Sequence, residues 1–167
     1  MIVVVDASPL IFLAKVRRLE LIVKLWGPDI RVPASVAEEV LAVGADPVEV
    51  EVLAAFLRQG RVETVRQPRR FALAMSQADN EALTLAVRVG AGVLLCDDKL
   101  TRRMAEAEGI RPMGTLGILL KAMRQHVLSP GDTRELLDRL VESHDFRIGI
   151  GVYQAVLGEI SKVEGRT

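Results

Sequence analysis

Apolar and polar residues alternate along this chain in blocks that predict strands and helices in turn. Residues 2–5 and 93–96 are short uncharged runs rich in valine and leucine, a pattern typical of strands buried on both faces of a parallel sheet. Segments with apolar residues every three or four positions predict amphipathic helices between the strands. The predicted strands are 2–5, 30–32, 62–65 (or an edge extension), 93–96, 110–113 and 146–150; the predicted helices are 9–25, 35–43, a segment ending at 57, 76–90, 98–108, 116–126, 130–142 and a last one ending near 162. This alternation predicts an α/β protein, a three-layer α/β/α fold with a central, mostly parallel sheet.

Composition narrows the class of protein. With 167 residues, 50% of them apolar, we expect a single domain over residues 1–167, in which the helices from about residue 130 serve as packing or as an oligomer surface. No uncharged stretch approaches the roughly 18 residues of a membrane span, and no signal peptide is recognisable. The single cysteine, Cys96, indicates a reducing, cytoplasmic setting. Zero net charge and 4% aromatic residues mean that any affinity for nucleic acid must come from local patches.

Two of the predicted strands run directly into aspartate. Asp6 follows residues 2–5, and Asp97 and Asp98 follow residues 93–96. Because ligands of parallel sheets bind beyond the carboxyl ends of the strands, these carboxylates are expected in that crevice. Asp6 has an alternative role as a helix N-cap, although Ser8 is the better cap. One of Asp97 and Asp98 should cap the next helix while the other faces the crevice, because successive residues that leave a strand diverge.

Three further acids lie at helix positions from which they can reach the same crevice. Glu39 borders the apolar stripe of its helix, where a carboxylate is costly unless it is paired or metal-bound. A glutamate that extends from the edge of that stripe into solvent explains the position equally well. Asp79 and Glu81 open the helix 76–90, where the helix dipole alone favours acids. Either one can reach a site at the helix terminus, and spacing does not choose between them.

Carboxylates crowded in this way predict a divalent cation. Without one, close carboxylates repel each other and some stay protonated, whereas Mg²⁺ or Mn²⁺ prefers oxygen ligands. Such a cation supports hydrolysis of a phosphodiester. Basic residues form a scattered rim that can hold a phosphate backbone. The RNA-backbone candidates in this rim are Arg69, Arg70 and Arg102; for Arg102 a solvated helix face with Glu106 as partner is the alternative.

Four segments in order make the chain similar to the PIN domain family, in particular to VapC-type toxin nucleases. They are residues 5–11 (Val-Asp-Ala-Ser-Pro-Leu-Ile), 33–40 (Pro-Ala-Ser-Val-Ala-Glu-Glu-Val), 79–86 (Asp-Asn-Glu-Ala-Leu-Thr-Leu-Ala) and 95–99 (Leu-Cys-Asp-Asp-Lys). The chain most resembles the sub-family with an Asp-Asp-x-x-x-Arg segment, here residues 97–102, and a Gly-Thr-Leu-Gly-Ile-Leu-Leu segment, here residues 114–120. The resemblance extends from residue 2 to about residue 157.

The resemblance implies a PIN-like fold and a small ribonuclease that cuts RNA with Mg²⁺ or Mn²⁺. The family's catalytic acids are carried over to Asp6, Glu39, Glu81 and Asp98. Asp79 competes with Glu81 for the third position, Asp97 stands beside the fourth, and both join the metal-ligand set; the family's hydroxyl position is Ser8. The third acid is more often aspartate in the family, and Cys96 stands where threonine is common. The resemblance further implies a homodimer and a toxin that is silenced by a small antitoxin protein.

Two other functions are compatible with strands that end in acids. The main alternative is a catalytically degenerate PIN-like domain that binds RNA or a partner protein. Intact acids favour the enzyme, whereas weak metal binding would favour the binding module. A response-regulator-like receiver needs paired acids after the first strand, where Asp6 stands alone.

Overall fold

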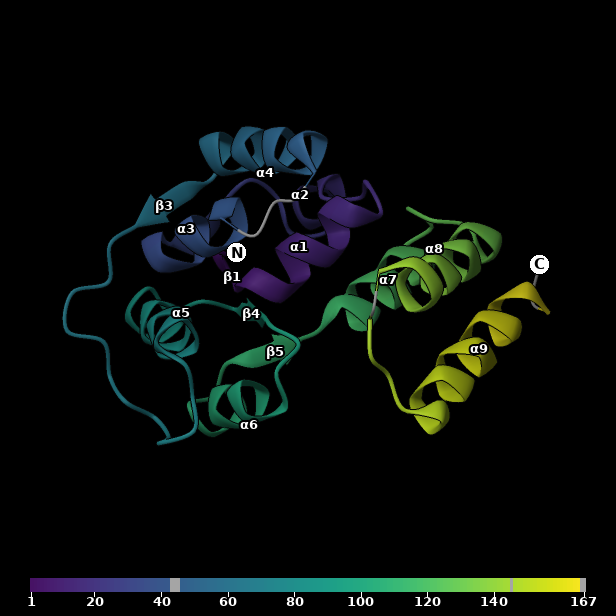
Figure 1. The fold of residues 1–167 in the computed structure, drawn as a ribbon. Helices are drawn as coiled ribbons and strands as arrows, with labels where there is room; N and C mark the ends of the chain where they lie inside the picture. The colour runs from purple at the N-terminus through teal and green to yellow at the C-terminus, as the bar shows by residue number, and fades with distance from the viewer. Residues whose placement is uncertain (43–45, 145, 166–167) are drawn as a thin grey trace.

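The computed structural model describes residues 1–42, 46–144 and 146–165, and Figure 1 shows their arrangement. Within these ranges, the chain forms five short strands, with helices between them and after the last one. The strands are β1 (Val3–Val5), β2 (Ile30–Pro33), β3 (Arg61–Glu63), β4 (Val93–Leu95) and β5 (Arg111–Met113). The helices are α1 (Ala7–Lys15), α2 (Glu20–Trp26), α3 (Ala34–Ala42), α4 (Pro47–Gln59), α5 (Gln77–Arg88), α6 (Lys99–Ala107), α7 (Thr115–Arg124), α8 (Pro130–Ser143) and α9 (Ile150–Glu164).

The strands form one sheet in the order β3-β2-β1-β4-β5, and every neighbouring pair is parallel. β1 is central, with Val3 paired to Ile30 of β2 and to Val93 of β4. The chain first adds β2 and β3 on one side of β1 and then crosses to add β4 and β5 on the other. The strand order therefore reverses between β1 and β4, the kind of point at which parallel sheets open a crevice for ligands. The predicted parallel α/β sheet is confirmed.

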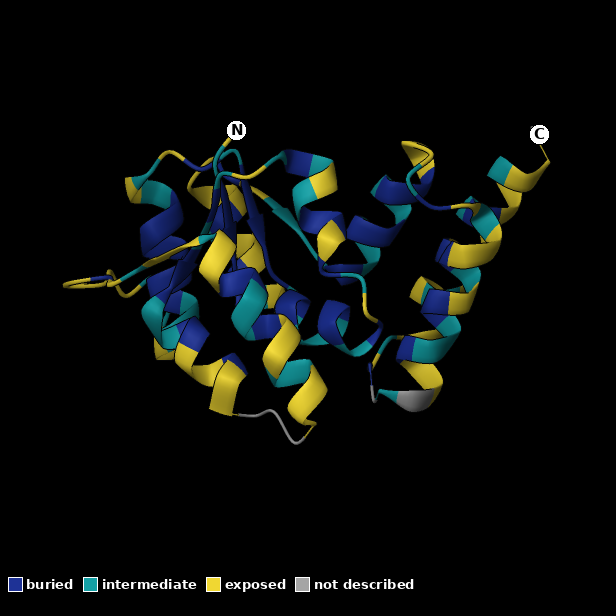
Figure 2. Cartoon of the chain, turned by 90° about the horizontal axis from the view of Figure 1, so that it is seen from above, coloured by how far each residue is buried: buried dark blue, intermediate teal, exposed yellow. Residues whose placement is uncertain are grey.

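Alternate residues of the central strands face two separate cores. Val3 and Val5 pack with side chains of α1, α2, α3, α4 and α7. Val4 and Leu94 point to the other face and pack with α5 and α6. In Figure 2 the central strands β1 and β4 are dark blue because both of their faces are covered. The uncharged runs β1 and β4 thus result from helices on both sides of the sheet, which gives the three layers.

Helix α7 joins the sheet layers to the C-terminal helices. Ile118 and Leu119 belong to the core beneath the sheet, whereas Met123 packs with Leu137 of α8 and Ile160 of α9. Figure 1 shows α8 and α9 beside α7, on the side of the molecule opposite β3. The C-terminal helices therefore pack against α7 and against each other; whether they also form an oligomer surface stays a prediction. No helix among the described residues is long and apolar enough to cross a membrane.

The prediction of one helix over residues 9–25 is wrong, because the structure has α1 and α2 there. The break between them includes Arg17, whose φ of 56° lies in the left-handed region. Val16 and Leu19 within the break are buried in the same core as both helices. Apolar residues therefore continue through the break and conceal it in the sequence pattern.

The prediction of a strand at 146–150 is also wrong. Residues 146–149 pair with no strand in the described part of the chain, and α9 begins at Ile150. Phe146 is apolar because its ring packs edge-on against Phe12, with the ring centroids 4.6 Å apart. The predicted helix end near Val43 and the break at Gly44 and Ala45 lie outside the described residues.

Candidate functional site

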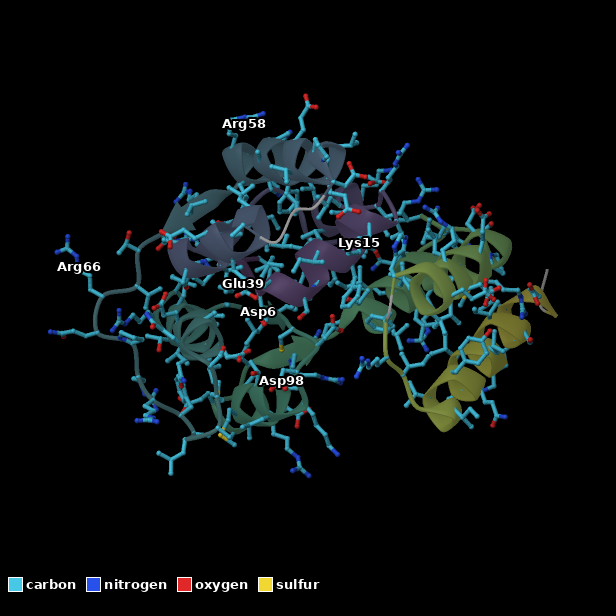
Figure 3. All side chains as sticks on the ribbon, in the orientation of Figure 1. Asp6, Lys15, Glu39, Arg58, Arg66 and Asp98 are labelled. Carbon is cyan, nitrogen blue, oxygen red and sulfur yellow. The ribbon has the colours of Figure 1, made fainter. Side chains whose placement is uncertain are left out.

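Two aspartates leave adjacent strands at the point where the strand order reverses. Val5 of β1 pairs with Leu95 of β4, and the backbone N–H of Asp6 donates to the carbonyl of Leu95 at 2.9 Å. Asp97 lies two residues beyond Leu95. In Figure 3 the labelled side chains of Asp6, Glu39 and Asp98 gather near the middle of the molecule. The carboxylates thus lie in the crevice that the topology creates.

Asp6 is a buried carboxyl group with few donors around it. Its side chain is 5% exposed. It occupies the N-cap position of α1, which begins at Ala7, but its side chain makes no capping hydrogen bond there. Burial, followed by the negative charges of Asp79, Glu39 and Asp97, raises the pKa of Asp6 to about 7, and the Ala7 N–H opposes them. The expectation that Ser8 would be the cap is wrong, because Ser8 is the second residue of α1, where it is half-buried.

Asp79 and Glu81, which the sequence left as alternatives, have different surroundings. Asp79 forms a capping box with Ser76 at the start of α5, and its Oδ1 accepts a hydrogen bond from Thr101 Oγ1 at 2.9 Å. Glu81 is 7% exposed, and its carboxylate accepts from Ser35 Oγ at 2.5 Å and from Gln77 Nε2 at 2.8 Å. The charge of Asp79 acts on Asp6, whereas Glu81 ties α5 to α3. The structure therefore brings Asp79 into the carboxylate cluster and uses Glu81 as a contact between helices.

Asp97 and Asp98 have different roles: one caps a helix and the other faces the crevice. Asp98 is exposed and caps α6, because its Oδ1 accepts from the backbone N–H of Thr101 at 2.8 Å. Asp97 accepts from the Thr115 N–H at 2.7 Å and from Thr115 Oγ1 at 2.6 Å. Burial raises the pKa of Asp97, while the two Thr115 hydrogen bonds and the charge of Arg102 lower it. A Cβ atom on Gly114 would lie 2.7 Å from Asp97 Oδ1, so this approach of Asp97 to α7 needs glycine at that position.

Glu39 completes the group of carboxylates from the solvent side. It lies on α3 and is exposed. Its negative charge nevertheless contributes to the raised pKa of Asp6. Asp6, Glu39, Asp79 and Asp97 thus form one electrostatic cluster, which we call the carboxylate cluster, built from β1, α3, α5 and the end of β4.

Of the predicted RNA-backbone residues, the structure places only Arg102 near this cluster. The charge of Arg102 lowers the pKa of Asp97. Arg69 instead donates two hydrogen bonds to the carboxylate of Glu108, at 3.0 and 2.9 Å. Glu108 follows the last turn of α6, at the end opposite Asp98. Arg70 is exposed in the same loop as Arg69.

Two threonines that position these carboxylates were not anticipated. Thr101 and Thr115 are fully buried, and between them they donate to Asp79, Asp98 and Asp97. The Thr101 hydroxyl has one hydrogen, so it donates to either Asp79 or Asp98 at a given moment. The available signal was positional: Thr101 is the third residue after a helix cap, and Thr115 follows a glycine that opens a helix.

The donor chemistry of the cluster fits a hard divalent cation, since every side chain in it offers carboxylate oxygen. The raised pKa of Asp6 is the expected consequence of burial together with neighbouring carboxylates that have no compensating positive charge. In the described part of the chain, no three acidic, histidine or cysteine side chains are placed so as to hold a metal ion. The residues therefore fit such an ion by charge and donor type, and ligation requires their side chains to turn toward each other.

Comparison with protein-family models matches residues 2–162 to a PIN domain family, DUF3368. The matched range begins just before β1 and ends within α9, so it contains every residue of the carboxylate cluster. No curated protein and no solved structure matches the chain.

Proposed function

The chain belongs to the PIN domain family, whose members are commonly nucleases. From this premise we propose that it is a metal-dependent endoribonuclease that hydrolyses RNA phosphodiester bonds. The observation that carries the proposal is the convergence of Asp6, Asp79, Asp97 and Glu39 at the reversal of strand order, with the pKa of Asp6 raised to about 7. A buried carboxyl group perturbed by neighbouring acids in a crevice is characteristic of functional sites.

Asp6, Asp79 and Asp97 are the residues proposed to hold Mg²⁺ or Mn²⁺, with Glu39 at the solvent side. When bound, the cation supplies the positive charge that stabilises a phosphodiester transition state. The roles of the neighbouring residues follow from their contacts. Thr115 keeps both oxygens of Asp97 oriented, and Thr101 connects Asp79 to Asp98. Arg102, exposed one turn into α6, is proposed to contact the RNA backbone.

Cleavage of a mixed pool of single-stranded RNA by purified protein, with EDTA, Mg²⁺ or Mn²⁺, tests this proposal. The informative variants are Asp6→Asn and Asp97→Asn, which remove one negative charge with little change in shape. Glu106→Gln is the matched control, because Glu106 is exposed on α6. We expect metal-dependent cleavage by the native protein and by Glu106→Gln, and its loss in both aspartate variants. Equal cleavage by all four proteins would identify a contaminating nuclease and overturn the proposal.

A second function, a binding module without catalysis, is favoured by one specific observation. Both oxygens of Asp97 and one oxygen of Asp79 already accept hydrogen bonds from threonine, so each must release or share a partner to ligate an ion. If the folded protein binds RNA but neither cuts it nor binds Mn²⁺ by calorimetry, the binding module replaces the enzyme.

A toxin role, control by an antitoxin protein, a homodimer and a cytoplasmic setting rest on the family resemblance and on the single cysteine. Cys96 is free and buried, as suits a reducing compartment. Induced expression in bacterial cells tests the toxin role, with Asp6→Asn as the control for the burden of expression. Growth arrest by the native chain alone, relieved by a co-expressed neighbouring gene product, is the expected result. Light scattering of the purified protein checks the dimer.

A further inference from the structure

A pocket separate from the carboxylate cluster opens between the end of α1, the start of α4 and the end of α8. Its volume is about 360 Å³, and its charged lining consists of Lys15, Arg17, Asp46, Glu49, Arg139 and His144. Three permanent positive charges and a histidine thus meet two acids. A pocket of this size accommodates a small polar group together with bound water.

Arg139 is exceptional among the half-buried arginines of the described residues. The others are Arg18, Arg31 and Arg134, and each lies within 3.8 Å of a carboxylate oxygen. Arg139 has no such ion pair among the described residues, although Glu135 and Glu142 lie one helical turn away on α8. Its guanidinium group instead lines the pocket. A partly buried guanidinium without a carboxylate partner is available for an external anion.

The acids of the pocket are already engaged. Glu49 lies 3.4 Å from Lys15 Nζ, and Asp46 accepts from the backbone N–H of Val48 at 2.8 Å, which caps α4. Among the described residues neither Arg17 nor Arg139 has an ion pair, and the three permanent cations of the pocket outnumber its two acids by one. The environment of His144 is consistent with this excess: burial, followed by the positive charges of Lys15 and Arg139, lowers the pKa of His144, and only Glu49 opposes them.

We propose that this pocket binds a phosphate group of the RNA strand, through Arg139 and Arg17, at a distance from the bond that is cut. This inference rests on the proposed ribonuclease function. Helix α1 connects the two places, because Asp6 occupies its N-cap position and Lys15 is its last residue, roughly 14 Å further along the helix axis at 1.5 Å per residue. Figure 3 shows Lys15 on the side of Asp6 that faces the C-terminal helices. The RNA strand thus contacts the protein at two places, the carboxylate cluster and the pocket.

Binding of a fluorescent single-stranded RNA in EDTA, measured over a series of salt concentrations, tests the pocket without cleavage. Arg139→Gln and Arg17→Gln are the two variants, so that a folding defect in one leaves the other informative. Arg58→Gln is the matched control, because Arg58 is exposed near the end of α4 and lies at the periphery in Figure 3. We expect each pocket variant to bind RNA roughly tenfold more weakly than Arg58→Gln. The slope of log K against log salt should fall in magnitude by about 0.7, as for one lost phosphate contact.

The histidines give a direct readout of the pocket. The chain has two of them, His126 and His144, and only the second lines the pocket. We expect RNA to shift the ring resonances of His144 and to leave those of His126 unchanged. Titration with inorganic phosphate separates the sources of the anion: a shift of His144 by phosphate and by RNA supports the inference, and a shift by phosphate alone overturns the contact with the strand.

Different results would overturn the role of the pocket and the proposed ribonuclease function. If native protein and pocket variants all cut and bind RNA as Arg58→Gln does, the pocket has no role and the ribonuclease stands. If the native protein binds RNA with the expected change in both pocket variants but cuts none in Mn²⁺, the pocket inference holds for a binding module. If the native protein binds no RNA, both are overturned.

Discussion

Two carboxyl groups of this protein are almost equally buried, yet their surroundings differ in every other respect. Asp6 is 5% exposed and Glu81 is 7% exposed. Glu81 accepts hydrogen bonds from Ser35 and Gln77 on two helices, while burial and the charges of three other acids raise the pKa of Asp6. A buried carboxylate that accepts several side-chain hydrogen bonds can stay charged, whereas one with few donors, such as Asp6, favours a proton or a ligand. This difference in hydrogen-bond donors, rather than burial, distinguishes an acid that connects two helices from the acid that we propose as a metal ligand.

Asp6→Asn is the variant expected to have the largest effect in a test of this difference between Asp6 and Glu81. We expect the variant to lose metal-dependent RNA cleavage by at least roughly a hundredfold, because one charge of the cluster is removed. In EDTA the same variant should be more stable than the native protein at pH 8. The folded pKa of about 7 lies above the ordinary value of 3.8. Ionisation of native Asp6 therefore reduces stability progressively as pH rises from about 4 to about 7, by at most about 4 kcal/mol in total.

Thermal and urea unfolding at pH 4 and pH 8 measure this effect. The two proteins should differ little at pH 4, where Asp6 is protonated in the folded state and about half ionised in the unfolded state. The gain in Asp6→Asn should level off above pH 7. Addition of Mn²⁺ at pH 8 should stabilise the native protein and leave the variant unchanged. A variant that is less stable at pH 8 would show that Asp6 is satisfied in the same way as Glu81.

The opposite result is expected for Glu81→Ala. Removal of this carboxylate leaves Ser35 and Gln77 without their acceptor, and we expect the free energy of unfolding to fall by about 3 kcal/mol. Affinity for Mn²⁺, measured by calorimetry on the folded variant, should stay close to the native value. Glu106→Ala on the exposed face of α6 is the control for the loss of an acid. A stable Glu81→Ala that no longer binds Mn²⁺ would return Glu81 to the ligand set.

Sequence reasoning located the carboxylate cluster but could not assign all of its members. β1 and β4 were predictable because strands covered on both faces must be apolar throughout, and the acids that follow such strands fall in the crevice. The choice between Asp79 and Glu81 depends on which side of α5 faces β1. Residues 79 and 81 are separated by about 200° around the helix, so an uncertainty of one residue, about 100°, in the helix rotation makes the two acids equally good candidates. Spacing alone contains no information about that rotation.

The break between α1 and α2 and the loop at Phe146 were hidden for a different reason. Both segments bury apolar side chains in the core of neighbouring helices, so hydrophobicity does not mark them as irregular. Arg69 illustrates the reverse problem. A basic loop resembles a surface for nucleic acid until the fold brings Glu108, 39 residues later in the chain, against it.

A smaller effect is expected at Asp97, a third carboxylate to compare with Asp6 and Glu81. Asp97 is placed between Asp6 and Glu81 in character, because burial raises its pKa while Thr115 lowers it. Thr115→Val removes the hydroxyl donor but keeps the shape and the backbone N–H. We expect roughly tenfold weaker Mn²⁺ binding, the usual effect of losing a group that orients a metal ligand.

Thr115→Ser is the control for this prediction, because it restores the hydroxyl and should recover the native affinity for Mn²⁺. The pH dependence of metal binding adds a second readout. The midpoint should move to higher pH in Thr115→Val, since the bond from Thr115 Oγ1 lowers the pKa of Asp97. An unchanged midpoint would mean that the backbone N–H alone positions Asp97.

The smallest effect is expected for Arg69→Gln. The carboxylate of Glu108 has two donors, like that of Glu81, but here the arginine side chain is 53% exposed. Exposed ion pairs contribute little, so unfolding free energy should fall by about 0.5 kcal/mol or less. RNA affinity should not change, because Arg69 lies at the end of α6 opposite the carboxylate cluster. Equilibrium binding of RNA beside the Arg102→Gln variant measures this: weaker binding by Arg69→Gln than by Arg102→Gln would place the RNA on the loop and contradict the path along α1.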